Sequence, residues 1–148
     1  MLPAPPESAW RFIEERGNEI ELLTFEPQGE QGCGVLNHIT MKILGLPVRA
    51  VSRTMIWDPP STCAFESVKP SWPVTTRITE MFRPSGGLTE HVIEYEVDGR
   101  GAIGSVVAPI FCRMMRRNRR LYQERLRAAL ARENSHHQPA AKPRGVVD

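Results

Sequence analysis

The sequence predicts an α+β domain in which a curved antiparallel sheet is covered by one long C-terminal helix. Two observations lead to this fold class. Residues 20–97 form short segments rich in Val, Ile, Thr, Phe and Tyr, separated by Gly and Pro clusters, and closely spaced strands of this kind pair in antiparallel fashion. Residues 102–132 then carry apolar side chains at intervals of three and four, which is the spacing of an amphipathic helix.

Composition and cysteine usage fit one intracellular globular domain. The 148 residues are 41% hydrophobic and 24% charged, and no stretch reaches the roughly 18 consecutive apolar residues of a membrane span. Residues 1–6 lack the basic and apolar regions of a secretion signal. The three cysteines are widely spaced without a CxxC pair, so neither a disulfide framework nor a zinc site is expected. We therefore predict a cytoplasmic protein with no metal or other cofactor.

A short amphipathic helix is expected near the N-terminus. Pro5 and Pro6 suit a first helical turn, and Gly17 suits a stop. The apolar residues between them recur at helical spacing: Ala9, Trp10, Phe12 and Ile13.

Two turns suggest how the following strands pair. If Asp58–Ser61 is a four-residue loop, Arg53 lies opposite Glu66 on a solvated face. The buried face of this hairpin then carries Ser52, Thr54, Ile56, Cys63, Phe65 and Ser67.

The second turn brings titratable side chains together. If Pro84–Gly87 is also a four-residue loop, Glu80 lies opposite His91 on the apolar face, with Tyr95 further along. The same face carries Ile78, Phe82 and Ile93. A carboxylate, an imidazole and a phenol in one apolar environment can exchange protons with a ligand or bind its polar end. The alternative is that Glu80 and His91 only satisfy each other's hydrogen bonds.

The basic residues are concentrated in the predicted C-terminal helix. Residues 1–110 contain 9 basic and 14 acidic side chains, whereas residues 111–132 contain 8 arginines and one acid. A basic amphipathic helix can lie on an anionic membrane surface, and Arg116, Arg117, Arg119 and Arg120 are the candidate contacts. The alternative is an ordinary solvated helix face. Nucleic acid is not an expected partner, because no aromatic residues are interleaved as stacking platforms.

Several short motifs and their order resemble the START-like (SRPBCC) superfamily, and within it the polyketide cyclase/dehydrase-like branch. The motifs are Pro-Pro-Glu-Ser-Ala-Trp at 5–10, Asp-Pro-Pro at 58–60, and Phe82 before a Gly-Gly turn, followed by the long helix; the resemblance covers residues 3–132. It implies a helix-grip fold, with the sheet wrapped around the C-terminal helix and an internal cavity between them. Members of the superfamily range from lipid carriers to aromatic cyclases, and no catalytic signature is shared by all of them.

The resemblance defines a ligand-binding domain over residues 1–133 and leaves a polar, disordered tail over 134–148. Together with the predicted strand faces, it implies a cavity lined by Ser52, Thr54, Ile56, Phe65, Ser67, Ile78, Phe82, Ile93, Ile103 and Val107.

Three functions are compatible with these residues. The first is binding or carrying a small hydrophobic molecule, lipid-like or polycyclic. The second is a cyclase or dehydratase acting on a polyketide-type substrate through Glu80, His91 and Tyr95. The third is an interaction module that uses the arginine-rich helix.

The start of the chain departs from the family pattern. Family members usually begin with a strand ahead of the first helix, yet only residues 1–4 precede it here. If Met1 is the true start, residues 89–97 are expected to form an open sheet edge, which favours a homodimer.

Overall fold

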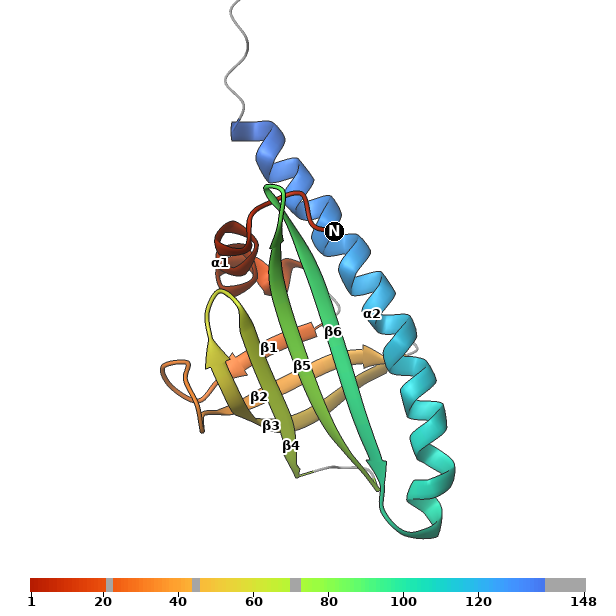
Figure 1. Ribbon diagram of the computed structural model, residues 1–148. Coiled ribbons are helices and arrows are strands. Elements are labelled where there is room, and N and C mark those ends of the chain that lie inside the picture. Colours follow the sequence, from red (N-terminus) through yellow and green to blue (C-terminus); the bar gives the residue numbers. More distant parts are fainter. Residues whose placement is uncertain (21–22, 44–45, 70–72, 138–148) are drawn as a thin grey trace, which may run out of the picture.

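The computed structural model describes residues 1–20, 23–43, 46–69 and 73–137. It confirms the α+β fold class: a six-stranded sheet in the order β1-β2-β3-β4-β5-β6, with every neighbouring pair antiparallel, accompanied by a long C-terminal helix (Figure 1). The elements in chain order are α1 (Pro6–Arg16), a 3-10 turn η1 (Gly17–Ile20), β1 (Leu23–Pro27), β2 (Leu36–Ile43), β3 (Leu46–Asp58), β4 (Thr62–Lys69), β5 (Val74–Ser85), β6 (Leu88–Gly99) and α2 (Gly101–His137).

The main core lies where α1 and the second half of α2 meet the sheet. Helix α1 starts with Pro6, which needs no intrahelical donor in the first turn, and it buries Trp10 and Phe12. On the α2 side, Leu126 and Leu130 are buried in the same cluster. This arrangement places α1 over the end of the sheet that carries the β3–β4 and β5–β6 turns (Figure 1).

The β5–β6 hairpin has a tighter turn than the sequence predicts. Gly86 and Gly87 both have positive φ, at 58° and 80°, and Ser85 pairs with Leu88, so only two residues form the connection. Two consecutive positive φ angles are typical of the type I′ turn, which matches the twist of paired strands. The predicted register was therefore wrong by two residues: Glu80 pairs with Ile93, and Phe82 pairs with His91. A shift of two keeps every side chain on its predicted face.

The β3–β4 hairpin differs by a bulge. Asp58 pairs with Thr62 across a shorter loop, and an irregularity between Thr54 and Ile56 then restores the predicted pairing of Arg53 with Glu66. The extra residue reverses the faces beyond it. Ile56, predicted to line the cavity, is 45% exposed, and Trp57 packs against the core instead.

A close backbone contact fixes the start of α2. A Cβ atom on Gly104 would lie 2.5 Å from the Pro73 carbonyl oxygen and 2.6 Å from the Gly99 carbonyl carbon. Gly104 therefore faces the sheet, and at about 100° per residue the side chain of Ile103 must point away. Ile103 is 70% exposed, so its predicted place in the cavity was wrong.

The outer edge of β6 is covered at its first half. The backbone amide of Leu2 donates to the Thr89 carbonyl oxygen at 2.7 Å, and the Thr89 amide donates back at 3.1 Å. Further along, the Gln123 amide donates to the His91 carbonyl oxygen and an Arg119 guanidinium donates to that of Ile93, each at 3.0 Å. Of the open edge predicted for residues 89–97, the part from Thr89 to Ile93 is thus covered by contacts within the chain, which weakens the argument for a homodimer through this edge.

The end of α2 lies beyond the predicted domain boundary. The helix continues to His137, four residues past 133, because no Gly or Pro stops it earlier. The rest of the predicted tail, residues 138–148, lies outside the described residues. Over the part of the chain that is described, none of the helices combines the length and the apolar character needed to cross a bilayer.

Candidate ligand-binding site

An interior cavity of about 260 Å³ lies between α1, the concave face of the sheet and α2. Most of its wall is apolar, and every layer of the fold contributes to it. The lining residues are Trp10, Ile13, Glu14, Gly17, Phe25, Pro27, Gln31, Ile39, Trp57, Cys63, Phe65, Ile78, Glu80, Phe82 and Tyr122.

A smaller satellite cavity of about 60 Å³ adjoins it on the α2 side. Ile78, Glu80 and Tyr122 line both cavities, so these three side chains form the boundary between them. The satellite cavity also brings in two predicted site residues, Ile93 and Tyr95.

Part of the predicted lining is therefore in place. Phe65, Ile78 and Phe82 line the interior cavity, and Ile93 lines the satellite cavity. The structure places the other predicted lining residues elsewhere: Ser52, Thr54, Ile56, Ser67, Ile103 and Val107.

Three of these displaced residues are held by local contacts. The Thr54 hydroxyl accepts a hydrogen bond from the Asn37 amide at 2.9 Å, and the Ser67 hydroxyl accepts one from the Thr76 backbone amide at 2.8 Å. Val107 packs against a separate cluster built on Phe111. The Thr54 and Ser67 hydroxyls thus bond to other residues of the sheet.

An aromatic wall that the sequence did not predict covers one end of the interior cavity. The Trp10 ring lies edge-on to Trp57 and to Phe82, with centroids 5.1 Å and 5.3 Å apart. Trp57 reaches this position only because of the β3 bulge. The tryptophan of α1 had a visible helical signal, but nothing in the sequence indicated which strand residue would meet it.

Glu80 and His91 form a hydrogen bond inside the protein. The His91 Nε2 atom lies 3.0 Å from the Glu80 Oε2 atom, and their side chains are only 1% and 14% exposed. The two residues are diagonal rather than directly opposed, and diagonal side chains on one sheet face remain within reach of each other. The His91 ring also stacks on Phe82, with centroids 4.6 Å apart, so the imidazole is fixed on two sides.

The neighbouring phenols and thiol stay neutral. Burial, and secondly the negative charge of Glu80, raises the pKa of Cys63 and of Tyr122 well above the ordinary values. Burial and Glu80 also raise the pKa of Tyr95, although Arg119 opposes this shift. Glu80 is therefore surrounded by neutral hydrogen-bond donors, and a second negative charge beside it is unfavourable.

Some buried polar atoms near this site have no protein partner among the described residues. They include Trp10 Nε1 and Gln31 Oε1, which belong to residues that line the interior cavity, and His91 Nδ1. Buried polar atoms are almost always hydrogen-bonded, so such unpaired atoms call for an explanation.

No family model matches this chain, and no curated protein sequence does. Solved structures match its shape instead. The protein TTHA0849 from Thermus thermophilus is 19% identical, with a TM-score of 0.71 over 89% of this chain and 93% of that one. The Zhui aromatase/cyclase from Streptomyces sp. R1128 is 13% identical, with a TM-score of 0.72 over 90% of each chain. The chain has the helix-grip fold. Ara h 8.0201 shares this helix-grip fold at 11% identity, with a TM-score of 0.64 over 88% of this chain and 93% of that one.

The interior cavity combines apolar walls with a few polar side chains, of which Glu80 is mostly buried. Aromatic and aliphatic side chains can hold a ring or chain, while Glu80 accepts hydrogen bonds and the Tyr122 hydroxyl can donate them. In the described part of the chain, no group of three His, Cys, Asp or Glu side chains could hold a metal ion.

Proposed function

We propose that the protein binds a small, largely apolar molecule in the interior cavity, with the polar end of that molecule at Glu80. The observation that carries this proposal is the composition of the cavity wall, in which aromatic and aliphatic side chains surround the mostly buried carboxylate of Glu80 and a few neutral donors, and the second carboxylate, Glu14, is exposed to solvent. Ligand sites are typically apolar clefts with a few convergent polar groups. At about 260 Å³ the cavity lies just below the roughly 300–1,000 Å³ of most such sites, which favours a ligand of one or two rings.

The polar groups indicate a neutral ligand. Glu80 uses its Oε2 atom for His91, and its side chain lines both cavities, so the carboxylate can also accept a hydrogen bond from a ligand hydroxyl. The raised pKa of Tyr122 keeps its phenol protonated as a donor to a ligand carbonyl. A phenol or hydroxy-ketone satisfies both groups, whereas a carboxylate ligand would be repelled by Glu80.

The helix-grip neighbours support the same class of ligand. One of them is named as an aromatase/cyclase, which is an activity on ring-forming compounds. A polyketide-type molecule of one or two rings is therefore our preferred ligand class, and transport or storage of it is our preferred role.

The test compares two fused-ring probes that differ by one hydroxyl. We expect 2-naphthol to bind about tenfold more tightly than naphthalene, because a hydrogen bond to a charged group contributes roughly 1.5–3 kcal/mol. Quenching of tryptophan fluorescence should report binding, since Trp10 and Trp57 line the cavity. Glu80→Gln should bring the two affinities close together, while leaving that of naphthalene unchanged.

The control for this comparison is Glu90→Gln, which removes a carboxylate from the exposed face of β6. This variant should keep the preference for 2-naphthol. Equal binding of both probes by the unmodified protein would argue against Glu80 as the polar contact. No binding of either probe, together with no apolar compound in a native mass spectrum of the purified protein, would argue against the cavity as a ligand site.

A cyclase or dehydratase activity is the alternative for the same cavity. It is favoured by the Glu80–His91 hydrogen bond: Glu80 lines both cavities and would be the acid–base group, while His91, which lines neither, would orient the Glu80 carboxylate. Tyr95 would be the third group, placed at the satellite cavity. A compound that co-purifies and is converted on incubation would support this alternative if His91→Phe stops the conversion and retains the compound.

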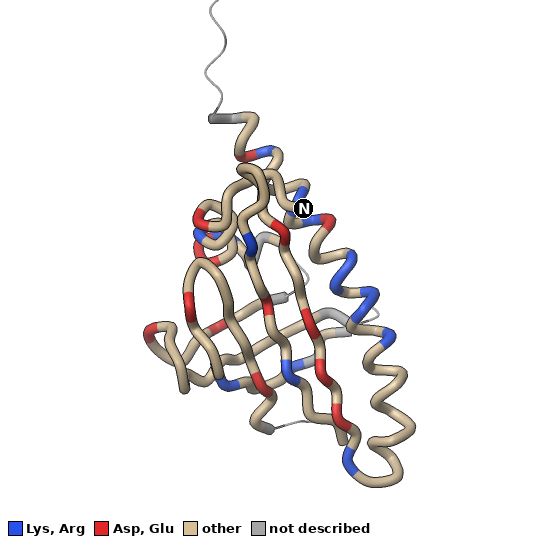
Figure 2. The backbone as a smooth tube through the Cα atoms, in the orientation of Figure 1, with Lys and Arg blue, Asp and Glu red and all other residues tan. Residues whose placement is uncertain are grey.

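The first half of α2 supports a second activity, attachment to an anionic membrane surface. Ile103, Val106 and Ile110 are 70%, 68% and 61% exposed and lie on one side of the helix. Arg116, Arg117 and Arg120 follow on the exposed surface, and no acidic residue occurs between Gly101 and Gln123. Figure 2 shows several basic positions along the middle of α2. Apolar and basic groups side by side are typical of helices that lie in a membrane interface. Arg119, predicted as a fourth contact, is partly buried and bonded to β6.

Vesicle sedimentation tests this attachment. We expect binding to phosphatidylserine-containing vesicles at low salt, and weakening as salt screens the charges. Changing Arg116, Arg117 and Arg120 to Gln should reduce binding roughly hundredfold, at about 1 kcal/mol per arginine. The matched control changes Arg49, Arg53 and Arg83, which are exposed on the sheet. An equal loss of vesicle binding in both variants would mean that net charge, and not the position of the arginines on α2, determines binding. If neither variant loses binding, the proposal is wrong.

A further inference from the structure

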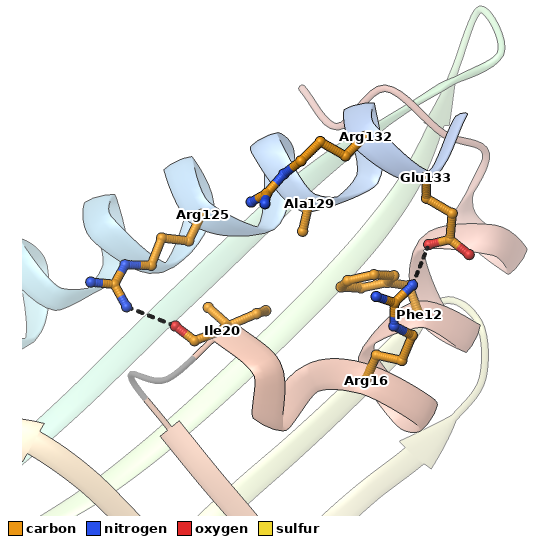
Figure 3. A pocket seen from close by; sticks show the side chains of 7 residues that line it. All are labelled: Phe12, Arg16, Ile20, Arg125, Ala129, Arg132 and Glu133. Carbon is orange, nitrogen blue, oxygen red and sulfur yellow. Dashed lines mark hydrogen bonds and ion pairs between the residues drawn. The ribbon is translucent and has the colours of Figure 1, made fainter. Parts of the chain in front are cut away.

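A second hollow, which we call the interhelix cleft, lies between α1 with η1 on one side and the last turns of α2 on the other (Figure 3). Its volume is about 370 Å³. On the side of α1 and η1, the cleft is lined by Phe12, Arg16 and Ile20, which are spaced by four residues. On the side of α2, it is lined by Arg125, Ala129, Arg132 and Glu133. The interhelix cleft and the interior cavity share no lining residue, so they are separate sites on opposite sides of α1.

Three arginines surround this cleft, and each is held by a contact. Arg125 donates from Nη1 to the Ile20 carbonyl oxygen at 2.9 Å, and Arg132 donates from Nε to the Ala128 carbonyl oxygen at 3.3 Å. Arg16 lies 3.7 Å from Glu133 in an ion pair, and its guanidinium sits over the Phe12 ring. Figure 3 shows Arg125 and Arg16 at opposite ends of the cleft, with Arg132 on the α2 side between them.

Two of these guanidinium groups keep donors for a ligand. An arginine side chain has five N–H donors in a planar fork. The contacts of Arg125 and Arg132 each use one nitrogen, and neither residue belongs to an ion pair within the described ranges. Because the first contact anchors each side chain, less conformational entropy is lost when a ligand binds the remaining donors.

The positive charge and the apolar surface of the interhelix cleft indicate which class of ligand it can bind. Three guanidinium groups face one carboxylate, so the cleft carries a positive excess. Phe12, Ile20 and Ala129 form apolar surface between the charged groups. Arginine forks match the oxygens of phosphate and carboxylate groups in bidentate geometry. A ligand that satisfies both parts has an oxyanion attached to a short apolar group.

We propose that the interhelix cleft is a second binding site, specific for an organic oxyanion such as a phosphate monoester or a carboxylate. It is independent of the interior cavity, where Glu80 disfavours anions, so the two sites select ligands of different charge. The oxyanion can come from a soluble metabolite or from a lipid headgroup, and both present the same chemistry to Arg125 and Arg132.

Calorimetric titration with butyl phosphate, inorganic phosphate and butanol tests this site. We expect butyl phosphate to bind most tightly, inorganic phosphate more weakly for lack of the apolar contact, and butanol not at all. The double variant Arg125→Gln, Arg132→Gln should lower the affinity for butyl phosphate at least about tenfold. The matched control, Arg49→Gln with Arg53→Gln, removes the same charge from exposed positions of the sheet and should keep the affinity.

Two further measurements keep the test decisive. Arg132→Gln alone, which loses only a contact within its own helix, should weaken binding without lowering the melting temperature. Binding to phosphatidic acid vesicles that depends on Arg125 and Arg132, in the absence of binding to butyl phosphate, would support the site and identify the lipid headgroup as its source. Equal losses in the double variant and its control, or no binding of any phosphate at low salt, would overturn the proposal. Naphthalene binding in the interior cavity should be the same in all of these variants.

Discussion

Ile78→Trp should abolish binding of 2-naphthol and naphthalene. Ile78 lies on the concave face of β5 and lines both the interior and the satellite cavity, so a larger ring at this position occupies the space a ligand needs. We expect an affinity loss well above tenfold. The interior cavity can accept part of the added volume, so the destabilisation should stay at or below the roughly 1–3 kcal/mol of an overpacked core.

The matched control is Thr79→Trp. Thr79 is the next residue of β5, and its side chain points to the other face of the sheet, since successive strand residues alternate. The same indole added there should leave ligand affinity unchanged. Tryptophan fluorescence would be confounded by the new ring, so calorimetry is the measurement of choice. Retained binding in Ile78→Trp would mean that the probes bind outside the interior cavity.

Gly104→Val should strongly destabilise the fold. The added Cβ atom would meet the backbone of Pro73 and Gly99, which cannot rotate away as a side chain can. Either α2 lifts from the sheet or the β6–α2 connection distorts. We expect a loss of about 3 kcal/mol or more in the free energy of unfolding, and a fall in melting temperature of roughly 10 °C.

Gly32→Ala is the control for this loss. A Cβ atom at Gly32 would meet nothing within 4 Å, and its backbone is not in the left-handed region. Urea unfolding of this variant should agree with the unmodified protein within about 0.5 kcal/mol. If Gly104→Val unfolds at the same urea concentration as Gly32→Ala, the close approach of β6 and α2 does not limit stability.

The sheet, its strand faces and the long helix could be predicted from the sequence, because periods of two and 3.6 residues are local signals. Registers depend on turn geometry instead. The Gly86-Gly87 pair had to be interpreted as a two-residue type I′ turn, and the prediction of a four-residue loop shifted every partner in β6. The bulge before Ile56 has no local sequence signal of its own, and it exchanged Ile56 for Trp57 at the core.

In the candidate site, too, the face of each strand could be predicted, whereas contacts that depend on how the elements pack could not. The contact between Glu80 and His91 was predicted in spite of the wrong register, because the face was right and diagonal neighbours still meet. Tyr122 lies within the helical pattern of residues 102–132, but that pattern could not assign it to the cavity, since its role depends on the rotation of α2. That rotation depends on the Gly104 contact, which involves Pro73 just before β5 as well as Gly99 at the end of β6. The interhelix cleft also depends on how α1 and α2 meet, and no pattern within either helix contains that information.

The contacts along β6 have a consequence for how the chain matures. Leu2, Gln123 and Arg119 take the places that a seventh strand would fill, so one backbone amide and two helix side chains protect three carbonyl groups of the sheet edge. Because α2 follows all six strands in the chain, the two carbonyl groups that it covers are unprotected during synthesis until the helix has left the ribosome and docked. The interval between completion of β6 and docking of α2 is therefore when the nascent chain is most prone to aggregate through this edge.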